Sequence, residues 1–186
     1  DIYIRFRNNH FSRYDLTPIE TVPILIQNQP SSILENAKAT LERYKNYSND
    51  SYLNEMSNLI AKVNSTGNVE LTQGNLKLKI TDDSAGNGEA HWVYTESGIE
   101  YTSKAVDMVF ENRVLTHMMD GYFLFTVSSN TNLAISQEEA VTIAKNYAKS
   151  MSWVINGEQV KGFNVLDEPV SIQMAPHPRT GTNNLI

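Results

Sequence analysis

The sequence predicts an α+β fold, in which helices pack on one face of an antiparallel sheet. Apolar residues follow a helical spacing over residues 32–63 and then alternate with polar residues over residues 76–110. Alternating strands keep one face in a core and the other in water, which is typical of antiparallel sheets. Because helices and strands come in separate runs along the chain, the α+β class is favoured over the α/β class.

The chain has 186 residues, which is enough for one domain or two small ones, and 40% of them are hydrophobic. Its net charge of −6 argues against nucleic acid as a partner, since binding to phosphates needs a basic surface. Cysteine is absent, which excludes disulfides, thiol catalysis and cysteine-based metal sites. No apolar run is long enough to predict a membrane span.

Residues 1–30 are predicted to be an extended N-terminal arm. Ile2, Ile4 and Phe6 alternate with polar or aromatic residues, as in a strand. Three prolines between residues 18 and 30 exclude a continuous central strand. We expect the arm to dock on an edge of its own sheet rather than a neighbour's, because a docked arm covers an edge that would otherwise aggregate.

Residues 31–130 are predicted to form two helices followed by antiparallel strands. Ser32 and Glu35 form the capping-box pattern that opens the first helix, and Asp50 or Ser51 begins the second. The expected strands are 76–80, 92–94, 99–101 and 106–110, with turns at 97–98 and 111–112.

The run 122–127 is apolar at nearly every position, which favours a central strand of the sheet. Residues 131–186 then repeat the order of a helix followed by strands. Ser136 and Glu139 form a second capping-box pattern, and Asn156-Gly157 is typical of a hairpin turn. The apolar stripe expected to pack on the sheet consists of Ala140, Ile143, Ala144 and Tyr147. This echo predicts a unit repeated twice, with the second copy incomplete.

The segment 135–144, Ile-Ser-Gln-Glu-Glu-Ala-Val-Thr-Ile-Ala, resembles the helix opening of PepSY-type domains. The preceding residues 106–127, with Asp120-Gly121-Tyr122 in the middle, are similar to the sheet region of extracytoplasmic PepSY-like proteins of bacteria and archaea. The resemblance extends over residues 92–174. It implies a binding or inhibitory role outside the cytoplasm, including regulation of a protease, and it implies no catalytic residue.

No pattern in the sequence points to catalysis, a cofactor or a metal. The four histidines, His10, His91, His117 and His177, do not show metal-ligand spacing, and the sequence has no phosphate loop or nucleophile elbow. We therefore predict a protein that is not an enzyme. The residues predicted to form an aromatic binding face are Trp92, Tyr94 and Tyr101.

Asn46, Asn49 and Asn64 each begin an Asn-x-Ser/Thr tripeptide and are candidate glycosylation sites. The PepSY resemblance implies an extracellular or cell-surface protein, and we expect its signal or anchor upstream of this chain. Two functions stay open. The first is a binding module for a protein or peptide partner, and the second is a structural cell-surface or filament subunit that self-associates by strand addition.

Overall fold

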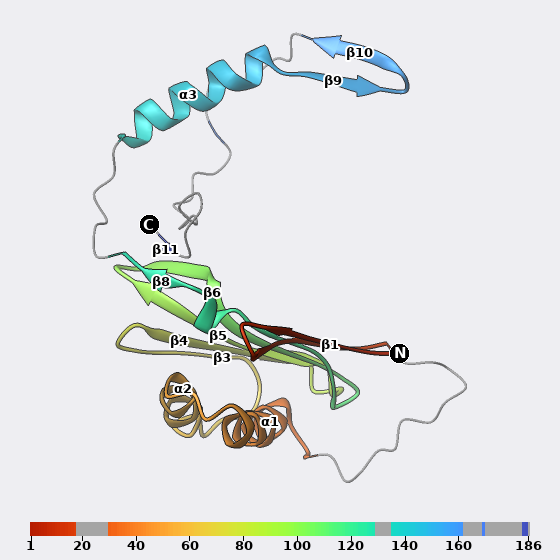
Figure 1. The fold of residues 1–186 in the computed structure, drawn as a ribbon, viewed down its shortest axis with the longest axis vertical. Coiled ribbons are helices and arrows are strands. Elements are labelled where there is room, and N and C mark those ends of the chain that lie inside the picture. The colour runs from red at the N-terminus through yellow and green to blue at the C-terminus, as the bar shows by residue number, and fades with distance from the viewer. Residues whose placement is uncertain (18–29, 129–134, 162–168, 170–183, 186) are drawn as a thin grey trace. The chain divides into compact units, whose positions relative to one another are not determined.

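The structure of the protein is a computed structural model, and it divides the chain into two compact units. The first unit comprises Asp1–Val127 and Ala175–Ile186, and the second comprises Ser128–Met174. The residues that the structure describes are 1–17, 30–128, 135–161, 169 and 184–185. The first unit contains a large antiparallel sheet with two helices, which confirms the predicted α+β class (Figure 1).

A seven-stranded antiparallel sheet with the order β1-β2-β7-β6-β5-β4-β3 forms the centre of the first unit. Its strands are β1 (Ile2–Arg7), β2 (His10–Leu16), β3 (Val69–Gln73), β4 (Leu76–Asp82), β5 (Gly88–Glu96), β6 (Ile99–Glu111) and β7 (Val114–Asp120). Asn8 and Asn9, between β1 and β2, have φ angles of 48° and 64°. Two successive positive φ angles are the mark of the type I′ turn that matches the twist of a hairpin.

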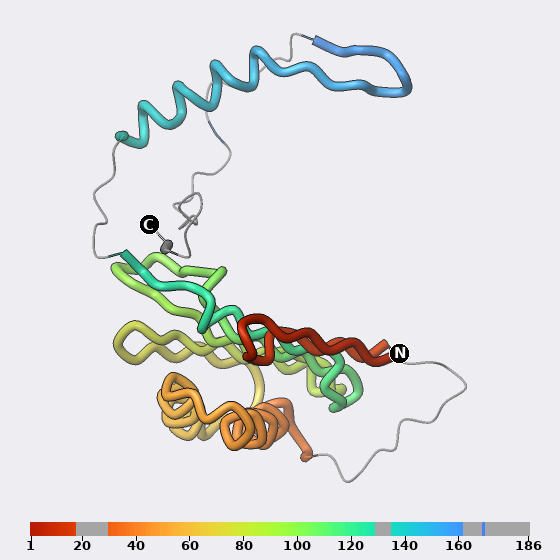
Figure 2. Tube along the Cα trace, viewed as in Figure 1, coloured from red at the N-terminus to blue at the C-terminus, as the bar shows by residue number. Residues whose placement is uncertain are grey.

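Helices α1 (Ile33–Ser48) and α2 (Tyr52–Ile60) lie together on one face of the sheet, as the tube in Figure 2 also shows. The Ser32 hydroxyl accepts a hydrogen bond from the Glu35 N–H at 3.3 Å and caps α1. The core is built from apolar side chains of both layers: Ile33, Leu41, Leu53, Met56, Leu59, Leu78, Ile80, Trp92, Met108 and Phe110. Each large side chain stabilises the fold by about 1.5–3 kcal/mol when fully buried.

The N-terminal arm is a β-hairpin that extends this sheet. Strand β2 pairs with β7 through Arg13 with Met119, Tyr14 with Met118, and Asp15 with His117. For residues 1–17 this confirms docking on the protein's own sheet. Residues 18–29 of the predicted arm lie outside the described residues.

The prediction of a central strand at 122–127 is wrong. Tyr122–Leu124 forms a short 3₁₀ helix, η1, and β8 (Thr126–Val127) pairs in parallel with β11 (Asn184–Leu185) in a separate small sheet. The chain bends because the Asp120 carboxylate accepts a hydrogen bond from the Tyr122 N–H at 2.9 Å. A side chain at Gly121 would meet the Ser103 carbonyl oxygen at 2.8 Å, so the bend also needs glycine.

The second unit contains helix α3 (Gln137–Ser150) and a hairpin of β9 (Ser152–Ile155) and β10 (Glu158–Lys161). Ser136 and Glu139 make both bonds of the predicted capping box. No residue of α3 is buried, and Ile143 and Tyr147 are exposed, so the structure does not show the packing predicted for the apolar stripe. Strands expected beyond residue 161 lie outside the described residues.

Leu53 of α2 is fully buried, so truncation of its side chain should reduce the stability of the fold strongly. Leu53→Ala should lower the free energy of unfolding by about 2–5 kcal/mol, because it removes buried methyl groups and leaves a cavity. Tyr47→Ala, at an exposed position of α1, is the control and should change it by less than about 1 kcal/mol. Urea denaturation measures both values, and equal losses would contradict this assignment of the core.

Candidate functional site

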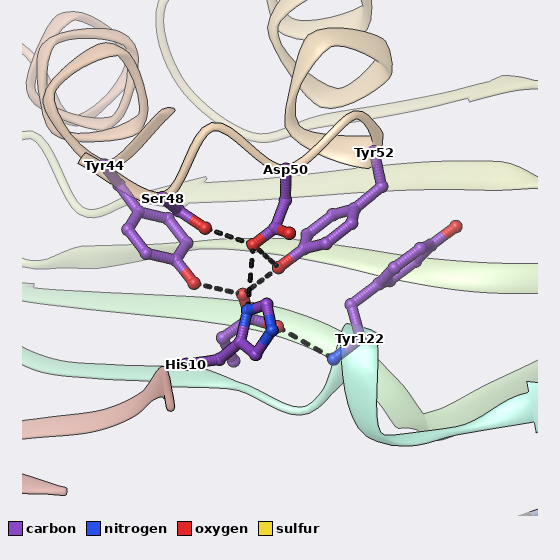
Figure 3. Close-up of polar contacts among 7 residues, drawn as sticks. His10, Tyr44, Ser48, Asp50, Tyr52 and Tyr122 are labelled. Atoms are coloured by element: carbon purple, nitrogen blue, oxygen red, sulfur yellow. Dashed lines mark hydrogen bonds and ion pairs between the residues drawn. The ribbon is translucent and has the colours of Figure 1, made fainter. Parts of the chain in front are cut away.

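The carboxylate of Asp120, at the end of β7, is fully buried beneath the two helices. Its Oδ2 accepts hydrogen bonds from the Tyr44 hydroxyl of α1 at 2.5 Å and from the Tyr52 hydroxyl of α2 at 2.6 Å. Its Oδ1 accepts the Tyr122 N–H of η1. The neighbouring helices α1 and α2 and the end of β7, which is distant from them in sequence, thus meet at one acidic group (Figure 3).

Burial dominates the electrostatics of this group. It raises the pKa of Asp120 above its usual range, while the hydrogen bonds from Tyr44, Tyr52 and Tyr122 act in the opposite direction. Burial and then the charge of Asp120 raise the pKa of Tyr44 and Tyr52 well above that of a free tyrosine. Both hydroxyls are therefore protonated at neutral pH and donate to the carboxylate.

A second carboxylate, Asp50, joins this cluster to the N-terminal hairpin. It accepts a hydrogen bond from the Ser48 hydroxyl, and His10 Nδ1 lies 3.3 Å from its Oδ2. The His10 ring stacks on Phe123 with 4.8 Å between the ring centroids. The start of β2 thereby contacts both the junction of α1 and α2 and η1.

Lys104 completes the surroundings of η1 from the side of β6. Its ammonium group donates to the carbonyl oxygens of Tyr122 and Phe125 at 2.9 and 2.6 Å, and it lies 4.2 Å from the centroid of the Tyr122 ring. Burial lowers the pKa of Lys104, and the nearby Asp120 opposes that effect. The ammonium therefore fixes the bend after β7 through backbone contacts and a cation–π contact.

The Asp120 cluster is a structural centre rather than a catalytic one. A general acid or base must reach its substrate through a hydrogen bond, directly or through one water. Asp120 has no exposed surface, and three protein donors already occupy its oxygens. Structural ion networks also perturb pKa values, and this geometry corresponds to such a network.

The sheet face opposite the helices carries paired charges. Lys77 and Lys79 alternate with buried Leu78 and Ile80, and Lys79 lies 2.8 Å from Glu100. The other pairs on this face include Lys77 with Glu70 and Glu100, His91 with Asp107, and His117 with Asp15. Each partly exposed pair contributes at most about 1 kcal/mol. Within the described residues, no group of three acidic or histidine side chains is placed to hold a metal.

Strand β1 is an edge of the sheet with exposed apolar side chains. Ile2 is 67% exposed, Ile4 52% and Phe6 54%. Asp1 and Thr17 exchange both backbone hydrogen bonds, at 2.8 and 2.9 Å, so the odd residues of β1 bond to β2. The pairing has a bulge between Arg5 and Phe6, but its extra residue, Ser12, belongs to β2, so the alternation along β1 continues to Phe6. The even residues therefore direct their N–H and C=O groups to the other side. None of the described strands pairs with that side.

The opposite edge of the sheet is better protected. Strand β3 has five residues, its Glu70 is paired with Lys77, and Gln73 accepts a hydrogen bond from Lys62 at 2.6 Å. The apolar residues of β3, Val69 and Leu71, are partly buried against the core, whereas the apolar residues of β1 are exposed. Because β1 is both apolar and open, β1 rather than β3 is the candidate binding edge.

The three predicted aromatic residues do not form a binding face. Trp92 is fully buried, opposite Leu78 on the side of the helices, and Tyr101 is also buried. Tyr94 is half-buried against Tyr101, with ring centroids 5.3 Å apart. Their prediction as a surface is corrected because strand alternation does not say which of the two faces is covered.

The three candidate glycosylation sites lie on the surface. Asn46, Asn49 and Asn64 are all exposed, in α1, at its left-handed C-terminal cap and in the loop after α2. Their glycosylation stays a prediction. His177 lies outside the described residues.

No protein-family model, characterised protein or solved structure matches this chain. The resemblance of residues 135–144 to PepSY-type domains therefore stays a prediction. Among the helices that the structure describes, none has both the length and the apolar composition needed to cross a membrane.

Removal of the Tyr52 hydroxyl should destabilise the protein. Tyr52→Phe is expected to lower the free energy of unfolding by about 1–3 kcal/mol, because a buried acceptor loses its donor. Tyr94→Phe is the matched control, because the Tyr94 hydroxyl donates a long hydrogen bond, 3.4 Å, to the partly exposed Glu96. Denaturation measures both variants. Equal losses of free energy of unfolding would show that the bond from Tyr52 to Asp120 stabilises the fold no more than an exposed bond does.

The raised pKa of Asp120 predicts a pH dependence of stability. The folded state holds this proton more tightly than the unfolded state, so stability falls as the pH rises from about 4 towards the folded pKa. The difference in free energy of unfolding between the wild type and Asp120→Asn should therefore fall over that range. A difference that rises with pH would mean that the hydrogen bonds outweigh burial.

Proposed function

We propose that the protein is a non-enzymatic binding module, acting outside the cytoplasm, that binds a protein or peptide partner by strand addition at β1. The observation that carries this proposal is the open side of β1. There, the backbone groups of Ile2, Ile4 and Phe6 point away from β2, and the same three side chains are exposed. An added strand would pair these backbone groups and cover the apolar side chains in one step.

The side chains on the two faces of β1 indicate which partner segment would pair with it. Ile2 and Ile4 share one row with Phe6, whereas Arg5 and Arg7 lie on the other row. Opposite charges and apolar pairs stabilise neighbouring strands by about 0.2–1 kcal/mol each. The best partner is thus an extended segment with alternate apolar residues and no basic residues opposite the arginines.

The edge is held on a rigid support. Phe6 contacts Phe11 with ring centroids 6.3 Å apart, and Phe11 contacts Tyr44 of α1 at 5.4 Å. His10, at the start of β2, reaches Asp50 in the polar cluster. A preformed edge lowers the ordering cost of binding, because only the partner must become extended.

Location outside the cytoplasm is supported by the PepSY resemblance and by the exposed Asn-x-Ser/Thr sites. The resemblance also supports a regulatory role, such as inhibition of a protease. The second candidate function is a structural cell-surface or filament subunit. It is favoured by the same observation, because an open β1 edge serves assembly as well as it serves the capture of a different partner.

Peptide binding tests the strand-addition proposal. A fluorescein-labelled peptide of sequence Glu-Ile-Glu-Val-Glu-Ile-Glu should bind the wild type in fluorescence polarisation. Ile4→Pro should weaken binding at least about tenfold, since proline removes an outward N–H that β2 does not use. Ile4→Thr, which keeps the N–H and the β-branched shape, should lose much less.

Circular dichroism and denaturation of both variants verify that the hairpin still folds. Binding of the peptide by Ile4→Pro with unchanged affinity would overturn β1 as the binding edge.

A further inference from the structure

We infer that the strand added at β1 is β1 of a second copy of this chain, so that two copies form a twofold dimer with one continuous sheet. The inference rests on the proposed function, because it uses the same edge and names its partner. Its basis is that β1 is complementary to itself in one antiparallel register.

The register is centred on Ile4, which lies opposite Ile4 of the second copy. Ile2 then lies opposite Phe6 of the second copy, and Phe6 opposite its Ile2. All three are the residues whose N–H and C=O groups point outward, so each opposed pair exchanges two hydrogen bonds. The three exposed apolar side chains of each copy form one row across the junction, which removes them from water.

The second row of side chains also matches in this register. Tyr3 lies opposite Arg5 of the second copy, in a pair of close, non-hydrogen-bonded residues. Within one chain, Arg5 already donates to the Tyr3 hydroxyl at 3.0 Å, and its guanidinium lies 5.9 Å from the centroid of that ring. The same two residue types across the junction would make a second hydrogen-bonded cation–π contact.

Other registers lose this match. A register centred on Arg5, or a parallel in-register pairing, places Arg5 opposite Arg5, and like charges directly opposite each other are destabilising. A shift by one residue places the outward N–H and C=O groups of one copy opposite residues whose groups bond to β2 in the other copy, so the hydrogen bonds between the copies cannot form. A register centred on Tyr3 leaves Phe6 without a partner. The pairing centred on Ile4 forms all three apolar pairs and places no like charges opposite each other.

Closure of the dimer follows from the symmetry. Pairing of β1 with β1 uses the same surface on both copies and ends there, whereas pairing of β1 with the β3 edge would repeat into a filament. The charged partners of Glu70 and Gln73 disfavour the second arrangement.

The test uses the full 186-residue chain in sedimentation velocity and light scattering over a range of concentrations. We expect the mass of two chains for the wild type and of one chain for Ile4→Pro, with Ile4→Val still dimeric. An excess of the acidic peptide should convert dimers to monomers, because both ligands use the same edge.

Single cysteines test the register, since the natural chain has none. Ile4→Cys places two cysteines opposite each other with Cα atoms about 5.5 Å apart, within the range of a disulfide. Ile2→Cys is the matched control, because its two copies are offset by four residues, about 13 Å. Mild oxidation should cross-link Ile4→Cys and leave Ile2→Cys as single chains on a non-reducing gel.

The possible failures separate the two ideas. A wild type that stays monomeric at all concentrations but binds the peptide would overturn the dimer and keep the proposed function. A monomer that binds no peptide would overturn both. Open-ended oligomers, or equal cross-linking of the two cysteine variants, would overturn the twofold register and favour assembly through β3.

Discussion

The buried carboxylate of Asp120 is the constraint on which the rest of this structure depends. An ionised group without partners costs several kilocalories per mole in a protein interior. Asp120 therefore requires the hydroxyls of Tyr44 and Tyr52 and the bend at Tyr122 to be present together. Apolar packing alone would tolerate several positions of two short helices on a sheet, whereas these directional bonds accept one.

The same network contacts the N-terminal hairpin, whose pairing sets the open edge of the sheet. Asp50 and His10 link it to the turn of the N-terminal hairpin, and β2 covers β7. The free edge is consequently moved outward by two strands, from β7 to β1, where apolar side chains alternate on an exposed strand. The apolar residues of β3 pack against the core, whereas those of β1 are exposed, and this asymmetry is expected of a module that recruits one strand at β1.

Local patterns predicted much of the fold correctly. The capping serines of α1 and α3, the alternation of β4 and the turns at Ser97-Gly98 and Asn156-Gly157 depend on neighbours within a few residues. The segment 122–127 was misread because its apolar residues serve a buried turn, and the bend depends on Ser103 as well as on Asp120. The prediction of Trp92 on an exposed binding face was wrong, because the alternation of a strand does not show which of its two faces is buried.

By itself, the sequence determined the fold class, the helix starts and the alternating row of Ile2, Ile4 and Phe6, since backbone preference and hydrophobic period are local properties. Only the tertiary structure decided that Asp120 meets Tyr44 and Tyr52, which are separated from it by 76 and 68 residues. It also decided that β2 pairs with β7 and leaves β1 outermost. Strand pairing and buried polar contacts join distant segments, and no local signal in one sequence records which distant segments meet.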